Sequence, residues 1–241
     1  AMPGIPIKTS WSREEDMSHD EYRPLAIARF KGSVAGGKTT ALQLDLAAPS
    51  VVASAMGRIG VPAAGPDFST VQAAWDQPYG IPNYRVTGYS ATKLLPLSFW
   101  RSVGASQNGF FHESAIDELA HAAGADPLHM RLALMTNHTS RKVLETVAEM
   151  ANWGSELPAG HARGVAFVHS FGVPAAEVVE VSSTPGGIKV LRVFAAVDVG
   201  IALDPRNIEA QVQGGINFGL AAAIMGEITI EDGKVVQSNF H

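Results

Sequence analysis

Cysteine is absent from the 241 residues, which excludes disulfides, thiolate metal sites and iron–sulfur ligation by this chain. No run of residues is long and apolar enough to cross a bilayer, and no N-terminal stretch has the hydrophobic region of a signal peptide. The formal net charge is −5, so the chain lacks the excess of Lys and Arg that is typical of nucleic-acid-binding proteins. These absences argue against a membrane span in this chain and against a nucleic-acid partner, and they leave the cellular compartment open.

The residues that are present indicate an α+β fold. Apolar residues make up 46% of the chain and charged residues 17%, an ordinary globular balance. Alternating strand patterns occur beside amphipathic helical patterns without regular strand–helix–strand spacing, which favours mixed strands and helices. A loop at 157–163 divides the pattern, so we predict two halves, residues 1–155 and 156–241. Both ends stop abruptly, and we therefore expect the chain to be part of a longer polypeptide.

Residues 32–39 match the phosphate-loop pattern G-x-x-x-x-G-K-[ST], but their surroundings favour a hairpin. A phosphate loop needs a helix that begins at the lysine, so that its positive end faces the phosphates. After Lys38, the apolar residues Leu42, Leu44 and Leu46 alternate with polar ones, which is the period of a strand. We therefore predict a strand–turn–strand, with nucleotide binding as an alternative that a helix at Lys38 would support.

The stretch from Ser98 to Glu113 carries the strongest functional pattern. Phe99 and Trp100 stand directly before Arg101, a run of small residues follows, and helical spacing then begins. A turn with few side chains lets main-chain N–H groups approach a ligand, and the start of a helix adds unpaired donors and partial positive charge. This arrangement suits an anionic or oxo-bearing ligand. An ordinary strand-to-helix connection with one exposed arginine explains the same residues, since such turns are common.

A second candidate lies in the later half, where the Asp-Pro pair at 204–205 predicts the start of a helix. Gln211 lies on this helix, and its amide can both donate and accept a hydrogen bond. A glutamine buried in the core explains the same position. Gly214, Gly215 and Gly219 each cost about 1 kcal/mol relative to alanine, so we expect close packing or a ligand beside them.

The pattern contains no metal site and no catalytic residue that we can assign. His112 and His121 do not have the spacing of a metal-binding pair, and we expect both at the surface. The acidic residues after Ser12 are explained by the start of a helix, where carboxylates match the helix dipole.

An ordered series of blocks extends over nearly the whole chain. It comprises Trp11-Ser12-Arg13-Glu14-Glu15-Asp16-Met17, Tyr22-Arg23-Pro24, Phe99-Trp100-Arg101-Ser102-Val103-Gly104, Asp117-Glu118-Leu119-Ala120, Asp198-Val199-Gly200, Ala210-Gln211-Val212-Gln213-Gly214-Gly215 and Gln237-Ser238-Asn239-Phe240. The series resembles the molybdenum-binding subunit of the xanthine dehydrogenase/aldehyde oxidase superfamily. The nearest branch is the large, or beta, subunit of isoquinoline 1-oxidoreductase. The fold that this resemblance implies is a partial α+β molybdenum cofactor-binding domain.

The resemblance implies an oxidoreductase that hydroxylates a small aromatic N-heterocycle or an aldehyde with water as the oxygen source. Its centre would be molybdenum held by molybdopterin, in the cytosine dinucleotide form common in bacteria, and the cofactor would carry the redox chemistry. Electrons would leave through an iron–sulfur small subunit, and the remaining part of the large subunit would complete the site. By analogy with the family, the protein would be located in either the bacterial cytoplasm or the periplasm.

Three residues match cofactor contacts within this resemblance. Arg101 matches an arginine whose main-chain N–H lies beside a molybdenum oxo ligand, and Trp100 would help to wall the centre. Gln211 matches a glutamine that hydrogen-bonds the pterin. Val103 stands where xanthine oxidases carry a phenylalanine that stacks on the purine, which argues against purine specificity. Gln213 stands where many relatives have glutamate, which reduces the local charge.

Two parts of the family pattern are not found in the sequence. These are the Gly-Gln-Gly block that grips the pterin and the glutamate that acts as general base, and neither Glu113 nor Glu227 matches the base. We therefore expect the chain alone to be inactive and to hold no cofactor, with truncated faces through which it could self-associate. A non-catalytic α+β binding module is the alternative.

Overall fold

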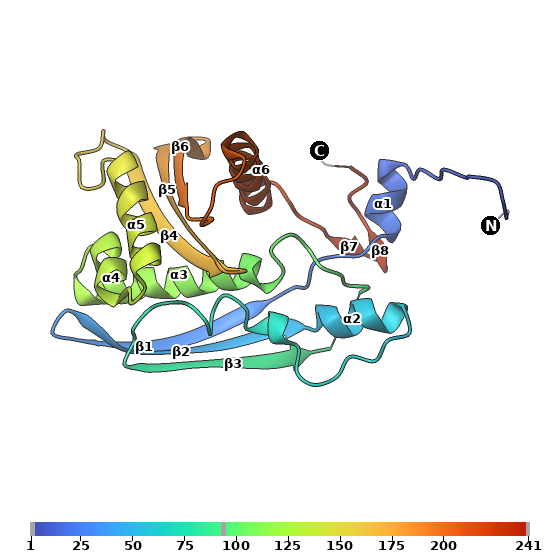
Figure 1. Ribbon diagram of the computed structural model, residues 1–241, viewed down its shortest axis with the longest axis horizontal. Coiled ribbons are helices and arrows are strands. Elements are labelled where there is room, and N and C mark those ends of the chain that lie inside the picture. Colours follow the sequence, from blue (N-terminus) through green and yellow to red (C-terminus); the bar gives the residue numbers. More distant parts are fainter. Residues whose placement is uncertain (1–2, 93–94, 240–241) are drawn as a thin grey trace. The chain divides into compact units, whose positions relative to one another are not determined.

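The computed structural model describes residues 3–92 and 95–239 and confirms the predicted α+β fold (Figure 1). Contacts divide the chain into two compact units. The larger unit is Arg23–Ile201, and the smaller unit is formed by the described residues before and after it. The predicted division at 155/156 lies in a loop of the larger unit, and as a boundary between functional halves it stays a prediction.

The first sheet of the larger unit consists of β1 (Ile27–Ala35), β2 (Lys38–Pro49) and β3 (Asn83–Ala91), in that order. β1 and β2 are antiparallel, whereas β2 and β3 are parallel. Gly36 and Gly37 form the turn between β1 and β2 with φ of 57° and 74°, which glycine adopts without steric cost. The predicted hairpin is confirmed. The phosphate-loop alternative is wrong, because Lys38 begins a strand and not a helix.

Helix α3 (Gly104–Ala123) packs on this sheet because both elements present an apolar side. Leu42, Leu44 and Leu46 alternate along β2 and are at most 2% exposed. Ile116 and Leu119 of α3 meet them in one buried cluster. Fully burying such a side chain contributes about 1.5–3 kcal/mol, so the position of α3 on the sheet is firmly determined. The turn that precedes α3 is positioned with it.

The second sheet consists of β4 (His161–Ser170), β5 (Val173–Thr184) and β6 (Gly187–Val197), paired antiparallel in chain order. Helix α5 (His138–Met150) packs against β5 and β6. It follows α4 (Pro127–Leu134), which begins at the Asp126 cap, where Oδ1 accepts the His129 N–H at 2.9 Å. Helix α3 lies between the two sheets (Figure 1), and Phe167 of β4 joins the same core as the leucines of β2.

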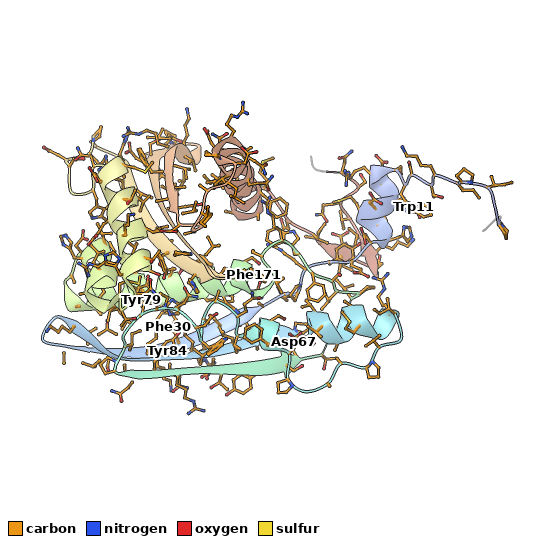
Figure 2. All side chains as sticks on the ribbon, in the orientation of Figure 1. Trp11, Phe30, Asp67, Tyr79, Tyr84 and Phe171 are labelled. Atoms are coloured by element: carbon orange, nitrogen blue, oxygen red, sulfur yellow. The ribbon has the colours of Figure 1, made fainter. Side chains whose placement is uncertain are left out.

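The connection between β2 and β3 carries α2 (Val51–Arg58) and the short helix η1 (Phe68–Thr70). Asp67 (Figure 2) ties the two together, because its Oδ2 accepts the Val52 N–H at 3.1 Å and its Oδ1 accepts the Ser69 N–H at 2.8 Å. Burial alone would raise the pKa of Asp67, but the hydrogen bonds from Ser50, Ser69 and Val52 outweigh it and lower the pKa. The connection is thereby shaped where it meets the start of α3.

The smaller unit contains α1 (Arg13–His19), α6 (Pro205–Ile224), β7 (Ile230–Glu231) and β8 (Lys234–Val235). The Asp204 side chain accepts the Asn207 N–H at 3.2 Å and caps α6 as predicted. Along α6 no described residue is fully buried. An added Cβ at Gly214 or Gly219 would meet nothing within 4 Å among the described residues. The described residues therefore do not pack closely on these two glycines, and the expectation of close packing or a ligand beside them stays a prediction.

Candidate functional site

The turn before α3 has an unusual backbone. Ser102 and Val103 have φ of 68° and 52°, in the region that side-chain-bearing residues rarely adopt. Such residues cost of order 1–3 kcal/mol each and persist only where the surroundings impose the conformation. Val103 is β-branched, which makes this conformation still less favourable. The turn therefore has to be held by contacts from outside it.

Contacts with the β2–β3 connection hold the helix side of the turn. The Gly104 N–H donates to Gln72 Oε1 at 3.3 Å. A Cβ added at Gly104 would lie 1.8 Å from the main-chain oxygen of Ser69, so only glycine fits there. Asn108 is buried, and its Nδ2 donates to the main-chain oxygens of Thr70 and Gln72 at 3.0 and 2.9 Å. Gly104 and Asn108 therefore fix the first part of α3 against the connection.

A hollow lies in front of the turn, within the larger unit. It is lined by Arg23, Pro24, Val51, Ser69, Phe99, Trp100, Val103, Gly104, Ser106 and Gln107. The guanidinium carbon of Arg23 lies 4.8 Å from the centre of the Trp100 ring. Ser106 Oγ donates to the Val103 oxygen at 2.9 Å, and its hydroxyl is 3.1 Å from Gln107 Oε1. A cation and an amide therefore line the hollow beside the positive end of α3, an arrangement that suits an anionic or oxo-bearing group.

The three predicted cofactor contacts lie in both units. Trp100 is half-buried and Arg101 is exposed, both at the turn in the larger unit. Gln211 is exposed on α6 in the smaller unit. The predicted convergence of Gln211 with the turn stays a prediction.

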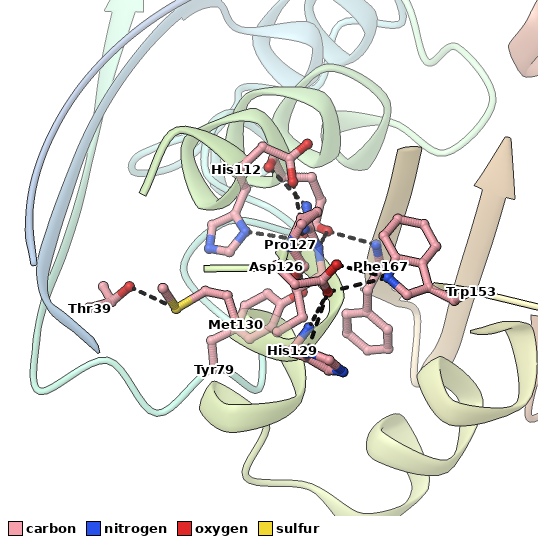
Figure 3. Close-up of polar contacts among 12 residues, drawn as sticks. Thr39, Tyr79, His112, Asp126, Pro127, His129, Met130, Trp153 and Phe167 are labelled. Atoms are coloured by element: carbon pink, nitrogen blue, oxygen red, sulfur yellow. Dashed lines mark hydrogen bonds and ion pairs between the residues drawn. The ribbon is translucent and has the colours of Figure 1, made fainter. Parts of the chain in front are cut away.

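A buried polar cluster behind the turn was missed in the sequence. Glu113 Oε2 accepts from Arg131 Nε at 2.8 Å and from the Phe167 N–H at 2.7 Å, and its Oε1 accepts from the Tyr79 hydroxyl at 3.0 Å. His112 stacks on Tyr79 with ring centres 5.4 Å apart (Figure 3). The prediction of His112 at the surface is wrong, since it is 1% exposed. Position 113 precedes the buried Ile116 and Ala120 by three and seven residues, and this helical spacing was the available signal.

Electrostatics keep Glu113 ionised. Burial alone would raise the pKa of its carboxyl, but the Arg131 guanidinium and the hydrogen bond from His112 outweigh it and hold the pKa below its usual value. Burial, and then the Glu113 charge, raise the pKa of Tyr79. A buried carboxylate with its oxygens already occupied is a structural acceptor and not a proton-abstracting base.

Two further observations concern the described residues. Residues 3–92 and 95–239 contain no group of three or more His, Cys, Asp or Glu side chains placed to hold a metal ion. Across the same residues, no helix has both the length and the apolar character needed to cross a membrane.

Comparison with known proteins identifies the family to which the chain is similar. Two domain families, both described as molybdopterin cofactor-binding domain, match residues 2–135 and 101–241. The beta subunit of isoquinoline 1-oxidoreductase from Brevundimonas diminuta is 30% identical over 254 residues, which cover 99% of this chain and 31% of that protein. A nicotinate dehydrogenase subunit from Pseudomonas putida is 26% identical over 258 residues, 98% of this chain and 22% of that protein. The chain thus spans about a third or less of these relatives.

A solved structure supports the fold. The aldehyde oxidoreductase of Desulfovibrio gigas aligns with 75% of this chain and 22% of its own, with a TM-score of 0.51 and 22% identity. The α+β arrangement of strands and helices is therefore one that a known protein also has.

Proposed function

This chain belongs to the molybdopterin cofactor-binding domain family, and on that basis we propose that it is part of the large subunit of a molybdenum hydroxylase or dehydrogenase. The observation that carries the proposal is that two such domains match the chain in order, at residues 2–135 and 101–241. The bound cofactor supplies the redox chemistry that takes oxygen from water. The chain contributes the surface that binds and orients it.

Trp100, Arg101 and Gln211 are the residues that we propose to contact the cofactor. The main chain at Arg101 carries the N–H donor, the Trp100 ring forms a wall, and the Gln211 amide donates to and accepts from the pterin. The donor set around the turn fits an anionic, oxo-bearing group. On α6, Gly214 follows Gln211 by three residues, and open space beside it leaves room for a ligand on that side of the helix.

We propose that the rest of the enzyme lies outside this sequence. The relatives are three or more times as long as the matched region, since the chain covers 31% and 22% of them. The pterin-gripping Gly-Gln-Gly block and the general-base glutamate would come from those parts. Because the chain has no cysteine, the iron–sulfur clusters would lie outside it, and from the family resemblance we propose that a small subunit carries them. The isolated chain would then be inactive and would bind no cofactor. In the longer polypeptide, we propose that the cofactor is the cytosine dinucleotide form of molybdopterin.

The proposed substrate is a small aromatic N-heterocycle, with aldehydes as the second class. Two relatives carry the names isoquinoline 1-oxidoreductase and nicotinate dehydrogenase, and both names refer to nitrogen heterocycles. Val103 at the turn offers a small apolar side chain in place of an aromatic ring. It would leave space for a ring system other than a purine.

Cofactor content tests the proposal. In the longer polypeptide, Gln211→Leu should lower bound molybdenum and pterin, whereas Gln213→Leu should not. Gln213 is the matched control, because it lies exposed on the same helix and its Nε2 donates to Glu209 Oε1 at 3.0 Å. The isolated chain should contain neither component. Stoichiometric molybdenum in the isolated chain would contradict the fragment proposal, and a longer polypeptide without pterin would favour a non-catalytic α+β binding module.

A further inference from the structure

We propose that Arg23 is a positioning residue that holds the turn from Trp100 to Val103 in its unfavourable conformation. Its guanidinium carbon lies 4.8 Å from the centre of the Trp100 ring, within the range of a cation–π contact. Arg23 is far from the turn in sequence, and both belong to the larger unit. The consequence for the cofactor rests on the proposed function, whereas the effect on the turn does not.

The guanidinium has no competing partner among the described residues. Within 3–92 and 95–239, no carboxylate pairs with Arg23 and no acceptor takes a hydrogen bond from it, although the side chain is exposed. The Trp100 ring is therefore the group that orients it. Arg23 also precedes Pro24, which restricts its backbone to extended conformations and lowers the entropy lost on ordering. Pro24 lines the same hollow as Trp100.

Different contacts hold the two sides of the turn. On the helix side, Gly104 fits closely against Ser69 and donates to Gln72. On the side of Trp100, the turn closes through the Val103 N–H, which donates to the Trp100 oxygen at 2.9 Å. A shift of the Trp100 main chain would carry that oxygen away from the Val103 N–H and release the strained residues that follow. Arg23 opposes this movement from across the hollow.

Arginine suits the task better than lysine does. Its planar, weakly hydrated guanidinium can stack on an indole, whereas an ammonium is a compact and strongly hydrated charge. A lysine at this position should therefore restore part of the effect. An apolar residue of similar length should restore none of it, and this graded rescue separates the cationic contact from simple filling of the hollow.

Hydrogen exchange of the 241-residue chain tests the proposal. Arg23→Ala should speed amide exchange in a peptide spanning 99–107 by about two- to five-fold, the size expected for an exposed cation–π contact. Arg23→Lys should give a smaller increase and Arg23→Met the full one. Arg29→Ala is the matched control, because Arg29 is exposed on β1 and its side chain forms no hydrogen bond or ion pair with the described residues. Exchange in α5 should not change in any variant.

An unchanged rate at 99–107 in Arg23→Ala, or an equal increase in Arg29→Ala, would overturn the proposal. Equal increases in the lysine and methionine variants would also overturn it, because they would show that charge is irrelevant. The longer polypeptide separates this proposal from the proposed function. If Arg23→Ala speeds exchange at the turn but leaves bound molybdenum and pterin unchanged, the role of Arg23 stands and the cofactor contact at the turn is refuted.

Discussion

Arg131 donates through Nε to Glu113 Oε2 at 2.8 Å, with 0% of one side chain and 6% of the other exposed to solvent. The pair joins α4 to α3. The same carboxylate oxygen accepts the Phe167 N–H of β4 at 2.7 Å, so one buried charge connects both helices to the second sheet. Buried pairs of this kind are hard to remove singly, because the remaining charge stays desolvated.

Glu113→Gln should destabilise the larger unit by about 3 kcal/mol, toward the lower end of the range for breaking a buried pair. The lower end applies because Asp117 still pairs with Arg131 at 2.6 Å. Chemical denaturation measures the loss. Glu145→Gln is the control, because its partner Arg141 is in an exposed pair on α5 worth only about 0.3–0.5 kcal/mol. Equal losses in the two variants would contradict a structural role for the buried pair.

The stability that Glu113 contributes should depend on pH. Its pKa is lowered in the folded chain, so the contribution is fully present above the unfolded value of about 4.3. It is lost as the pH falls through the folded value. Denaturation at several pH values below about 5 should therefore show a steeper decline in the native chain than in Glu113→Gln. Parallel declines would mean that other carboxyl groups account for acid unfolding.

Gly104→Ala should lower the free energy of unfolding by about 1–3 kcal/mol, the usual cost of overpacking. The added methyl would lie 1.8 Å from the Ser69 oxygen, which is main chain and cannot rotate away. The matched change is Gly214→Ala on α6, where a Cβ meets nothing within 4 Å. That variant should gain up to about 1 kcal/mol of helix stability. Circular dichroism during denaturation measures both, and a stable Gly104→Ala would show that the turn is not tightly packed.

Local patterns predict much of this fold. The alternation of Leu42, Leu44 and Leu46 predicts β2, and the Asp204–Pro205 pair predicts the start of α6, because strand period and capping depend on neighbouring residues alone. The same local period predicts the hairpin at residues 32–39, because the alternation after Lys38 outweighs a short motif.

The rest depends on contacts between distant residues. The sequence alone does not predict His112 and Glu113 in the core. The free-energy cost of burying Glu113 is offset by hydrogen bonds from an arginine on another helix and from a main-chain N–H on β4, and neither is close in sequence. The start of α3 at Gly104 likewise depends on Ser69 and Gln72 of a remote connection. The pairing of Gln211 with the turn came from family resemblance and stays a prediction.

Lys38→Ala should leave both stability and nucleotide binding unchanged. The lysine is exposed at the start of β2, beside a turn of two glycines, so it has no helix end with which to form a phosphate site. Calorimetry with ATP and Mg²⁺ should detect no micromolar binding in either the native chain or the variant. Binding that disappears in Lys38→Ala would restore the phosphate-loop interpretation.

Trp100→Ala and Arg101→Ala should differ in the longer polypeptide. The proposed role of Arg101 belongs to its main-chain N–H, which alanine retains, so bound molybdenum and pterin should stay near the native amounts. Trp100→Ala removes both the proposed wall of the cofactor site and the contact with Arg23 at 4.8 Å, so the bound amounts should fall. Elemental analysis and pterin fluorescence measure the two components. A loss in Arg101→Ala equal to that in Trp100→Ala would show that the arginine acts through its side chain, because the main chain is the same in both.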